Sequence, residues 1–424
     1  MCEHSFLHLW TYPNLFKKPG KELVDLLVVF RDDIVLFSDK SCGYPDTGNF
    51  HLDWQRWYRR AIADSAHQLW QAERWIRTRP DAIFLDAKCQ EPLPLHMPNP
   101  EQMKIHHVCV ATGATERCLA SNLPGLGLDV AVVGDENPLK VGRVCEIDGW
   151  LHIFDEGSIN TVLAELNTMP DFIAYLNAKL VMLNSGTFQS ASSEVDMLAQ
   201  YLWNGRSFPI VDRPYFLKSG LWQEIEANAA FLAGRAENEI SFFWDNLIEH
   251  ITKHFINRTL EVGNELKINE YEMIFRVMAS ETRFDRRVLT KAIWQRAEAA
   301  QTGSIASLLP SQQSDVIYVL LIVPRTQGSS YEARRKLRAE ELWARCIATK
   351  AARPEKRFII GIALDAPGEG GGSEDFVYLD TIDWGDEQMR LARRVREESQ
   401  YFIEGKAIET PLYEEEYPGG GENF

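Results

Sequence analysis

Two short apolar runs lie close together near the start of the chain. They cover residues 23–30 and 33–38, they are almost continuous in Val, Leu, Ile and Phe, and a polar segment around Asp32 joins them. Short runs of this kind, rich in β-branched residues and linked by a polar tip, predict paired strands that are buried on both faces. We therefore expect a β-hairpin over residues 20–41.

After a loop rich in Gly and Pro, the pattern changes to a helical period. A long amphipathic stretch covers residues 53–78 and ends just before Pro80, as helices commonly do. Two further apolar runs, residues 82–85 and 105–111, predict strands. The order strand, strand, helix, strand, strand predicts an α/β domain over residues 1–115.

The remaining chain divides into three predicted regions. Residues 116–192 mix strands (128–133 and 150–154) with helices (158–166 and a second after Pro170), residues 193–305 have helical periodicity, and residues 306–424 form a C-terminal α/β region with a flexible tail. In that last region we expect strands at 316–323, 358–364 and 376–379, and helices at 331–352 and 387–402. The predicted fold class is therefore mixed α/β.

Composition narrows the class of protein. A hydrophobic content of 45% is sufficient for buried cores, and a net charge of −16 argues against a protein that coats nucleic acid indiscriminately, although it allows a local basic surface. The seven cysteines are scattered without a CxxC pair, which favours reduced thiols and a cytoplasmic location. Because no apolar run approaches 18 residues and the N-terminus lacks a signal-peptide pattern, we expect no membrane association.

Acidic residues and a lysine stand at the ends of the predicted hairpin. Asp25 lies early in the first strand, Glu22 lies three residues before it, and Lys40 ends the second strand. Hydrolysis of a phosphodiester needs a group that neutralises the phosphate and a group that activates water, and a metal ion held by carboxylates beside a lysine meets both needs. The following helix adds Gln68.

This arrangement resembles the PD-(D/E)xK, or restriction-endonuclease-like, nuclease superfamily. There, an acid on one strand precedes an acid-x-lysine triplet on the next strand, and a helical glutamine follows. The resemblance covers about a quarter of the chain. It implies that Asp25 and Glu22 hold Mg²⁺ or Mn²⁺, that Lys40 orients or deprotonates the attacking water, and that Gln68 positions this water or a phosphate oxygen.

One position departs from the superfamily pattern. Ser38 stands where a second acid is expected, and it would line the site. Strand alternation places Asp39 on the opposite face from Ser38 and Lys40, so that Asp39 becomes a third metal ligand only if a bulge redirects it or its backbone carbonyl takes part. The segment before Gly20 is also short for the helix that usually precedes the hairpin.

The implied activity is metal-dependent hydrolysis of nucleic acid, DNA more than RNA, in defence against foreign DNA. The wider chain also resembles a bacterial protein family with a GKEL-D-LLV…FSDK signature, which brings no settled activity. Two other functions stay open. One is a catalytically inactive nuclease-like module that binds nucleic acid or a protein partner, and the other is a regulatory scaffold that acts as a homo-oligomer or in a complex.

Two basic stretches are candidates for binding nucleic acid. In the helix after the hairpin, Arg56, Arg59 and Arg60 alternate with tryptophans that we expect in the core. Between residues 334 and 357, nine Lys or Arg stand against three Glu, and Arg334, Arg335 and Lys336 begin this stretch. The alternative for the second stretch is a solvated helix face.

Four other motifs give weaker signals. Asp86-Ala87-Lys88 spells the superfamily triplet, but it follows Asp81 too closely for two strands, and we expect a solvated edge there. His250 and His254 share a helix face without a third ligand, and the neighbours His106-His107 point to opposite faces of a strand. The GEGGGS segment lacks the lysine of a phosphate loop and predicts a connection.

Overall fold

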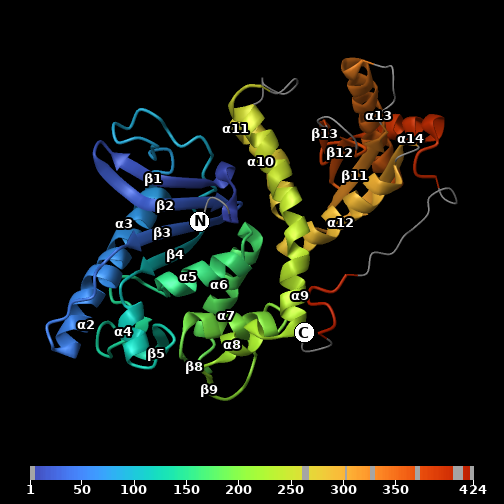
Figure 1. Ribbon diagram of the computed structural model, residues 1–424. Helices are drawn as coiled ribbons and strands as arrows, with labels where there is room; N and C mark the ends of the chain where they lie inside the picture. The colour runs from blue at the N-terminus through green and yellow to red at the C-terminus, as the bar shows by residue number, and fades with distance from the viewer. Residues whose placement is uncertain are drawn as a thin grey trace. The chain divides into compact units, whose positions relative to one another are not determined.

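The computed structural model describes residues 5–259, 267–300, 303–324, 330–367, 373–403 and 414–420. The chain divides into two compact units. Unit 1 is Met1–Ala236, Leu247–Thr282 and Tyr417–Phe424, and unit 2 is Glu237–Asn246 and Arg283–Glu416. Both units combine helices with sheets (Figure 1), so the predicted mixed α/β fold class is confirmed. No helix in the described ranges is both long enough and apolar enough to cross a membrane.

A five-stranded sheet organises the first part of unit 1. Its order is β1 (Thr11–Lys18), β2 (Lys21–Phe30), β3 (Asp33–Lys40), β4 (Lys104–Ala111) and β7 (His152–Phe154). The first three strands are antiparallel to their neighbours, whereas β3, β4 and β7 run parallel. The predicted hairpin is therefore confirmed as β2 and β3, and the predicted strand over 105–111 as β4.

The predicted helix over residues 53–78 is interrupted by one π turn. It consists of α2 (Phe50–Tyr58), the π segment η2 (Arg59–Ala63) and α3 (Asp64–Thr78). The Asn49 side chain accepts a hydrogen bond from the Leu52 N–H and so caps the first turn. A π turn within a helix frees backbone groups and is often found at functional sites.

Strand alternation sends the side chains of β3 to two helical layers. Phe37 stacks on Phe172, with ring centroids 6.1 Å apart and an interplanar angle of 14°, and Phe172 belongs to α6 (Met169–Leu183). The next residue, Ser38, faces Gln68 of α3. The sheet is thus covered by α3 on one face and by α6 with α5 (Glu156–Glu165) on the other, and residue parity decides which layer a side chain meets.

Three local predictions for unit 1 are corrected. Residues 82–85 form no strand, because Phe84 makes only isolated bridges, to Phe16 and to Pro92. The N-cap of α5 is Asp155, whose side chain accepts the N–H of Ser158, so Ser158 is the third helical residue of a capping box and not the cap itself. The segment before Gly20 forms β1, which the sequence did not predict.

The remainder of unit 1 adds a smaller sheet and short helices. The sheet has the order β6 (Lys140–Arg143), β5 (Gly127–Val133), β8 (Phe188–Ala191) and β9 (Tyr215–Leu217). Of these strands, the sequence predicted only β5. The described part of residues 193–305 is mainly helical as predicted, in α7 (Glu194–Trp203), α8 (Leu221–Glu226), α9 (Ala229–Asn238), α10 (Phe242–Ile256) and α11 (Ile268–Ala279), and in α12 (Arg283–Ala299), which belongs to unit 2. Helix α4 (Thr115–Ala120) precedes β5.

Unit 2 has its own four-stranded sheet with the order β10 (Ile305–Pro310), β11 (Val316–Val323), β12 (Phe358–Asp365) and β13 (Glu374–Asp380). The two central strands are parallel and joined through α13 (Tyr331–Ala352), and α14 (Asp386–Ser399) follows β13. Leu342 and Cys346 of α13 pack on this sheet. A Cβ atom at Gly361 would lie 2.5 Å from the Cys346 Sγ, so glycine permits this close approach of helix and strand.

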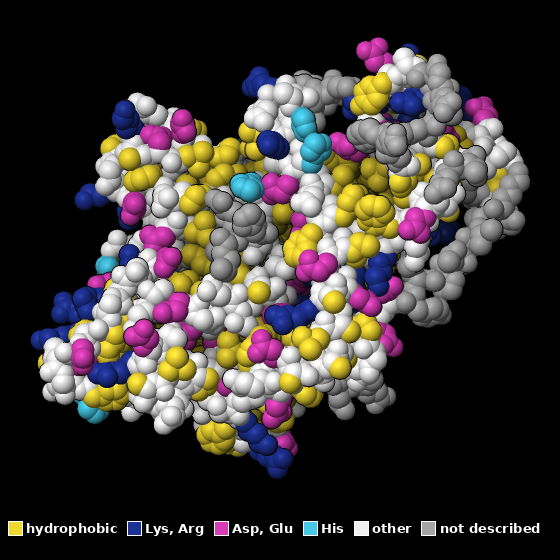
Figure 2. Space-filling model, viewed as in Figure 1, with side chains coloured by type: hydrophobic (Ala, Val, Ile, Leu, Met, Phe, Trp, Pro, Cys, Tyr) yellow, Lys and Arg dark blue, Asp and Glu magenta, His cyan; other side chains and the backbone are white. Residues whose placement is uncertain are grey.

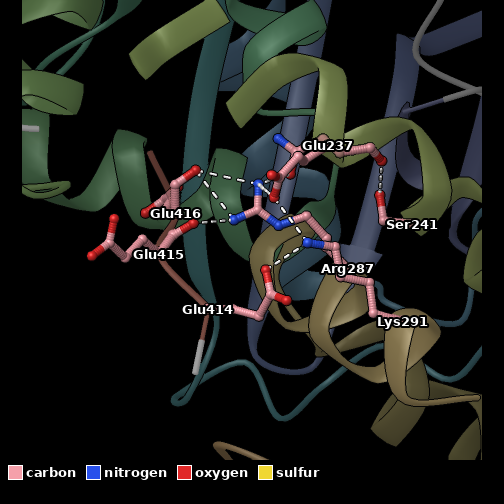
Figure 3. Close-up of polar contacts among 8 residues, drawn as sticks. Glu237, Ser241, Arg287, Lys291, Glu414, Glu415 and Glu416 are labelled. Carbon is pink, nitrogen blue, oxygen red and sulfur yellow. Dashed lines mark hydrogen bonds and ion pairs between the residues drawn. The ribbon is translucent and has the colours of Figure 1, made fainter. Parts of the chain in front are cut away.

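A buried arginine fixes the last described segment of unit 2 (Figure 3). The side chain of Arg287 is fully buried and donates hydrogen bonds to the backbone carbonyls of Glu415 and Glu416. Lys291, one turn further along α12, bridges Glu237 and Glu414 at 2.9 and 2.6 Å. The acidic run of residues 414–416 is therefore bound both through its backbone and through a side chain.

Candidate active site

Asp25 lies where the ladder between β2 and β3 ends. The last backbone pair is Leu26 with Phe37, so Asp25 and Ser38 come next and share the face that looks toward α3. Beyond this point, the N–H of Asp39 donates to the Asp25 Oδ2 at 2.8 Å. The carboxylate of Asp25 therefore takes the place of a backbone acceptor at the strand end.

Gln68 connects the two strands from the helix above them. Its Nε2 lies 3.3 Å from the Asp25 Oδ1, and its Oε1 lies 3.4 Å from the Ser38 Oγ. Ser38 is fully buried, whereas Asp25 and Gln68 are half-buried. The structure thus brings together three of the predicted site residues, each from a different element.

The backbone of Asp39 lies beside Asp25, whereas its exposed side chain stays on the opposite face of β3 from Ser38, because the β3–β4 ladder runs through residues 38–40 without a register shift. Partial loss of hydration and the nearby Asp25 carboxylate raise the pKa of Asp39, and Lys40 partly opposes this shift. Magnesium needs only one or two protein carboxylates because it keeps several waters. Asp25 is therefore the residue of the predicted set whose carboxylate fits a metal ion on the α3 face of the sheet.

The predicted set of three metal ligands is not assembled. Among the described residues, no three His, Cys, Asp or Glu side chains gather closely enough to hold a metal ion. Glu22 is exposed and pairs with Phe16 of β1, and a register shift between the β1–β2 pairs Leu15–Val24 and Phe16–Glu22 separates it from Asp25. Glu22 is thus not part of the group formed by Asp25, Ser38 and Gln68.

Lys40 is half-buried at the end of β3. Its carbonyl accepts hydrogen bonds from the N–H and the Oγ1 of Thr112, both at 3.2 Å, which fix the strand end. No ion pair joins Lys40 to Asp25, both of which the structure describes. Cys109 lies on the neighbouring strand, and burial raises the pKa of its thiol to about 12, so this cysteine is no candidate nucleophile.

The three arginines of the first basic stretch lie on the surface. Arg56, Arg59 and Arg60 are exposed, and Arg60 donates to the carbonyl of Gly43 in the loop after β3, at 3.3 Å. Lys and Arg side chains gather over α2 and α3 at the left edge of the face shown in Figure 2. Trp54 and Trp57 are fully buried, which confirms their predicted place in the core.

The second basic stretch is largely occupied by contacts within unit 2. Arg335 donates to Asp375 at 2.9 Å, and the buried Arg338 lies between Asp365 and Asp375 at 2.6 and 2.7 Å. Lys336 is exposed and Arg334 is half-buried. Most of the positive charge in this stretch therefore stabilises the sheet and its loops, because one face of α13 packs on the sheet.

The weaker motifs have structural roles. Asp86 accepts hydrogen bonds from three backbone N–H groups, those of Lys88, Gln90 and Glu91, so its carboxylate caps a turn. The rings of His250 and His254 meet edge to face, with centroids 4.6 Å apart and an interplanar angle of 68°. Residues 368–372 of the GEGGGS segment lie outside the described residues.

The two adjacent histidines of β4 point to opposite faces, as predicted. His106 Nε2 lies 3.1 Å from the Asp33 Oδ1, whereas His107 Nε2 lies 2.9 Å from the Glu73 Oε2 of α3. The ring of His106 also lies 6.1 Å from that of His152 on β7. The two side chains therefore belong to separate buried polar groups.

The sequence did not predict a buried polar group on the α6 side of the sheet. Lys179 is fully buried, and its Nζ lies 2.5 Å from the Glu194 Oε2, while the Tyr175 hydroxyl donates to the Glu194 Oε1 at 2.7 Å. The spacing of Tyr175 and Lys179, four residues apart on one helix, is the only signal in the sequence for this group.

Comparison with protein-family models, curated proteins and solved structures finds no match to this chain.

Proposed function

We propose that unit 1 is a metal-dependent nuclease that hydrolyses phosphodiester bonds of nucleic acid, DNA more than RNA. The observation that carries this proposal is the convergence of Asp25, Ser38 and Gln68 from β2, β3 and α3, with the backbone N–H of Asp39 donating to Asp25. Their order agrees with the resemblance to PD-(D/E)xK nucleases. We expect the activity in the cytoplasm, in defence against foreign DNA.

Each residue has a defined task in this proposal. Asp25, with the backbone carbonyl of Asp39, would hold Mg²⁺ or Mn²⁺, and the ion would supply charge neutralisation at the phosphate. Gln68 orients the attacking water or a phosphate oxygen, and Lys40 at the strand end assists removal of the proton from that water. Ser38 lines the site and fixes Gln68. Glu22 lies outside this arrangement and has no assigned task.

Cleavage assays with matched variants test the proposal. The pure protein is incubated with supercoiled plasmid and with single-stranded DNA, in Mg²⁺, Mn²⁺ or EDTA. We expect cleavage that requires metal and is lost in Asp25→Asn and Lys40→Gln but kept in Asp32→Asn, a change of an exposed acid at the hairpin tip. Cleavage that survives both active-site substitutions would contradict the proposal. Circular dichroism verifies that the variants are folded.

A second candidate function follows from Ser38. This residue is fully buried and stands at the position of an expected second acid, so that the metal site has lost one carboxylate. A module of this kind would bind nucleic acid without cutting it. Binding that weakens steeply with salt, together with no metal-dependent cleavage under any condition tested, would favour this function.

A further inference from the structure

A second group of unit 1 cations lies at the turn between β1 and β2. Lys17, Lys18 and Lys21 fall within five residues, and Lys18 pairs directly with Lys21 across the hairpin. None of the three forms an ion pair with a carboxylate within the described part of the chain. Loss of hydration, and then the charges of Lys18 and Lys21, lower the pKa of Lys17. These like charges therefore crowd one another in a chain that is acidic overall.

Two cations, one of them from this turn, lie over an aromatic ring of α3. The Nζ of Lys18 lies 5.4 Å from the centroid of the Trp75 ring, and the guanidinium of Arg79 lies 4.9 Å from it. The Trp75 Nε1 donates to the carbonyl of Ala82 at 2.8 Å, which fixes the ring. Next to Trp75, Arg74 lies 4.7 Å from the ring of Trp70. The rings thus hold positive groups in place without neutralising them.

These residues form what we call the lysine–tryptophan surface, which consists of Lys17, Lys18, Lys21, Arg74, Trp75 and Arg79. It lies close to the candidate active site along two elements. Gln68 and Trp75 are seven residues apart and share one face of α3, about 10 Å along the helix axis at 1.5 Å per residue. On β2, Lys21 precedes Asp25 by four residues, about 13 Å at 3.3 Å per residue. Either distance corresponds to about three or four steps of a DNA strand at 3.4 Å per step.

We propose that the lysine–tryptophan surface binds the phosphate backbone of the nucleic acid strand that flanks the scissile phosphate. This inference rests on the proposed nuclease function, because it places the strand between Asp25 and Trp75. The evidence for a polynucleotide is charge complementarity and the spacing to the site: cations without carboxylate partners in the described structure lie three or four nucleotide steps from Asp25 and Gln68. An acidic polypeptide would be bound by the same charges, but it has no phosphodiester for the neighbouring candidate active site.

Binding measured without metal separates this inference from catalysis. The probe is a fluorescein-labelled 20-base-pair DNA duplex, and its anisotropy is followed in EDTA at several salt concentrations. We expect the double variant Lys18→Gln/Arg79→Gln to bind at least ten-fold more weakly than the wild type. We also expect the slope of log affinity against log salt to become shallower by about 1.8, because each phosphate contact contributes about 0.9. Lys218→Gln/Lys253→Gln, which removes two exposed cations elsewhere, is expected to bind like the wild type.

Three further arms decide how a negative result is interpreted. Lys18→Arg/Arg79→Lys keeps the charges and is expected to restore binding, which excludes a mere loss of structure. Unchanged affinity and slope in Lys18→Gln/Arg79→Gln would overturn the inference even if the wild type cuts DNA. Equal competition by polyglutamate would also overturn it, because the surface would then be a general anion site. If Lys18→Gln/Arg79→Gln loses binding as expected but the wild type never cleaves DNA, only the proposed nuclease function is contradicted.

Discussion

Helix α12 of unit 2 and the basic surface of unit 1 use positive charge in opposite ways. In unit 2, Arg283, Arg286 and Arg287 of α12 are almost completely buried, and the first two are paired with Asp245. In unit 1, exposed cations such as Lys18 and Arg59 have no carboxylate partner in the described structure. Charge density along the sequence is high in both places, so the number of Lys and Arg residues does not distinguish a binding surface from an internal framework.

The difference follows from the cost of burial. A guanidinium removed from water must be compensated by carboxylates or carbonyls, and Arg can meet this need because it has five donors in a planar fork. An exposed cation has no such requirement and keeps its hydration until a partner displaces it. The basic stretch of α13 illustrates the first case, since Arg338 holds Asp365 and Asp375, whereas α2 illustrates the second.

The largest effect is expected for Arg338→Ala. This change leaves the mostly buried carboxylate of Asp365 without its arginine and Asp375 with Arg335 alone, and loss of a buried pair costs about 3–5 kcal/mol of unfolding free energy. Urea unfolding followed by circular dichroism measures it. Arg353→Ala, at an exposed position of the same stretch, is the matched control and is expected to change stability by less than about 0.5 kcal/mol.

If Arg338→Ala were to cost as little as Arg353→Ala, the proposed contrast between the two units would fail. The positive charge of α13 would then be available to an external partner. A loss that is present in Arg338→Ala and absent in Arg353→Ala would confirm that this charge belongs to the framework of unit 2.

Periodicity predicted the elements that are long and buried, such as β2, β3, β4 and α13, because their apolar runs have no other stable arrangement. It did not predict β1, where Pro13 and polar residues break the pattern, or the edge strand β9, which is only three residues long. For the candidate site, the order of Asp25, Ser38 and Gln68 along the chain was sufficient to predict that these three side chains come together. The pairing of Asp39 with Asp25 depends on where the ladder ends, and the buried partners of Arg338 depend on tertiary packing, so neither is visible in the sequence.

Buried ionisable groups of unit 1 test whether charges in its interior also depend on compensating partners, as the buried arginines of unit 2 do. The contact with His107, together with the hydrogen bond from Arg77, lowers the pKa of Glu73 to about 2 although burial opposes the shift. The folded protein thus binds fewer protons than the unfolded chain between pH 4.5 and pH 2. This pair of pKa values corresponds to at most about 3 kcal/mol of stability, present above pH 4.5 and lost as the pH falls through 2.

Glu73→Gln is expected to remove this part of the pH dependence. The wild type should lose stability relative to Glu73→Gln as the pH is lowered from 5 to 2, and the two curves should converge at the acid end. Chemical unfolding at several pH values measures both curves. Parallel curves would show that Glu73 is not a charged partner of His107 and Arg77.

A gain in stability is expected from His152→Leu. The ring of His152 is buried, neither of its nitrogens has a hydrogen-bond partner in the structure, and burial, followed by the charge of Lys179, holds its pKa well below the ordinary value. Leucine removes the unpaired polar atoms without breaking a bond, which favours the folded state by about 1–2 kcal/mol. The gain should grow below pH 6.5, where the unfolded histidine takes up a proton. His106→Leu breaks the contact with Asp33 and is expected to destabilise, so equal effects of the two changes would contradict the prediction.

The smallest effect on stability is expected for Arg59→Ala, and it makes the contrast between the units most explicit. Arg59 is exposed in the π turn, so its removal should change the unfolding free energy by no more than about 0.5 kcal/mol. If Arg59 instead contacts a phosphate, the same change should make the slope of log DNA affinity against log salt shallower by about 0.9. Anisotropy titrations in EDTA measure this slope, and Arg353→Ala is again the control. An unaltered slope together with unaltered stability would remove Arg59 from the binding surface, because a cation that stabilises neither the fold nor a complex is only a solvated side chain.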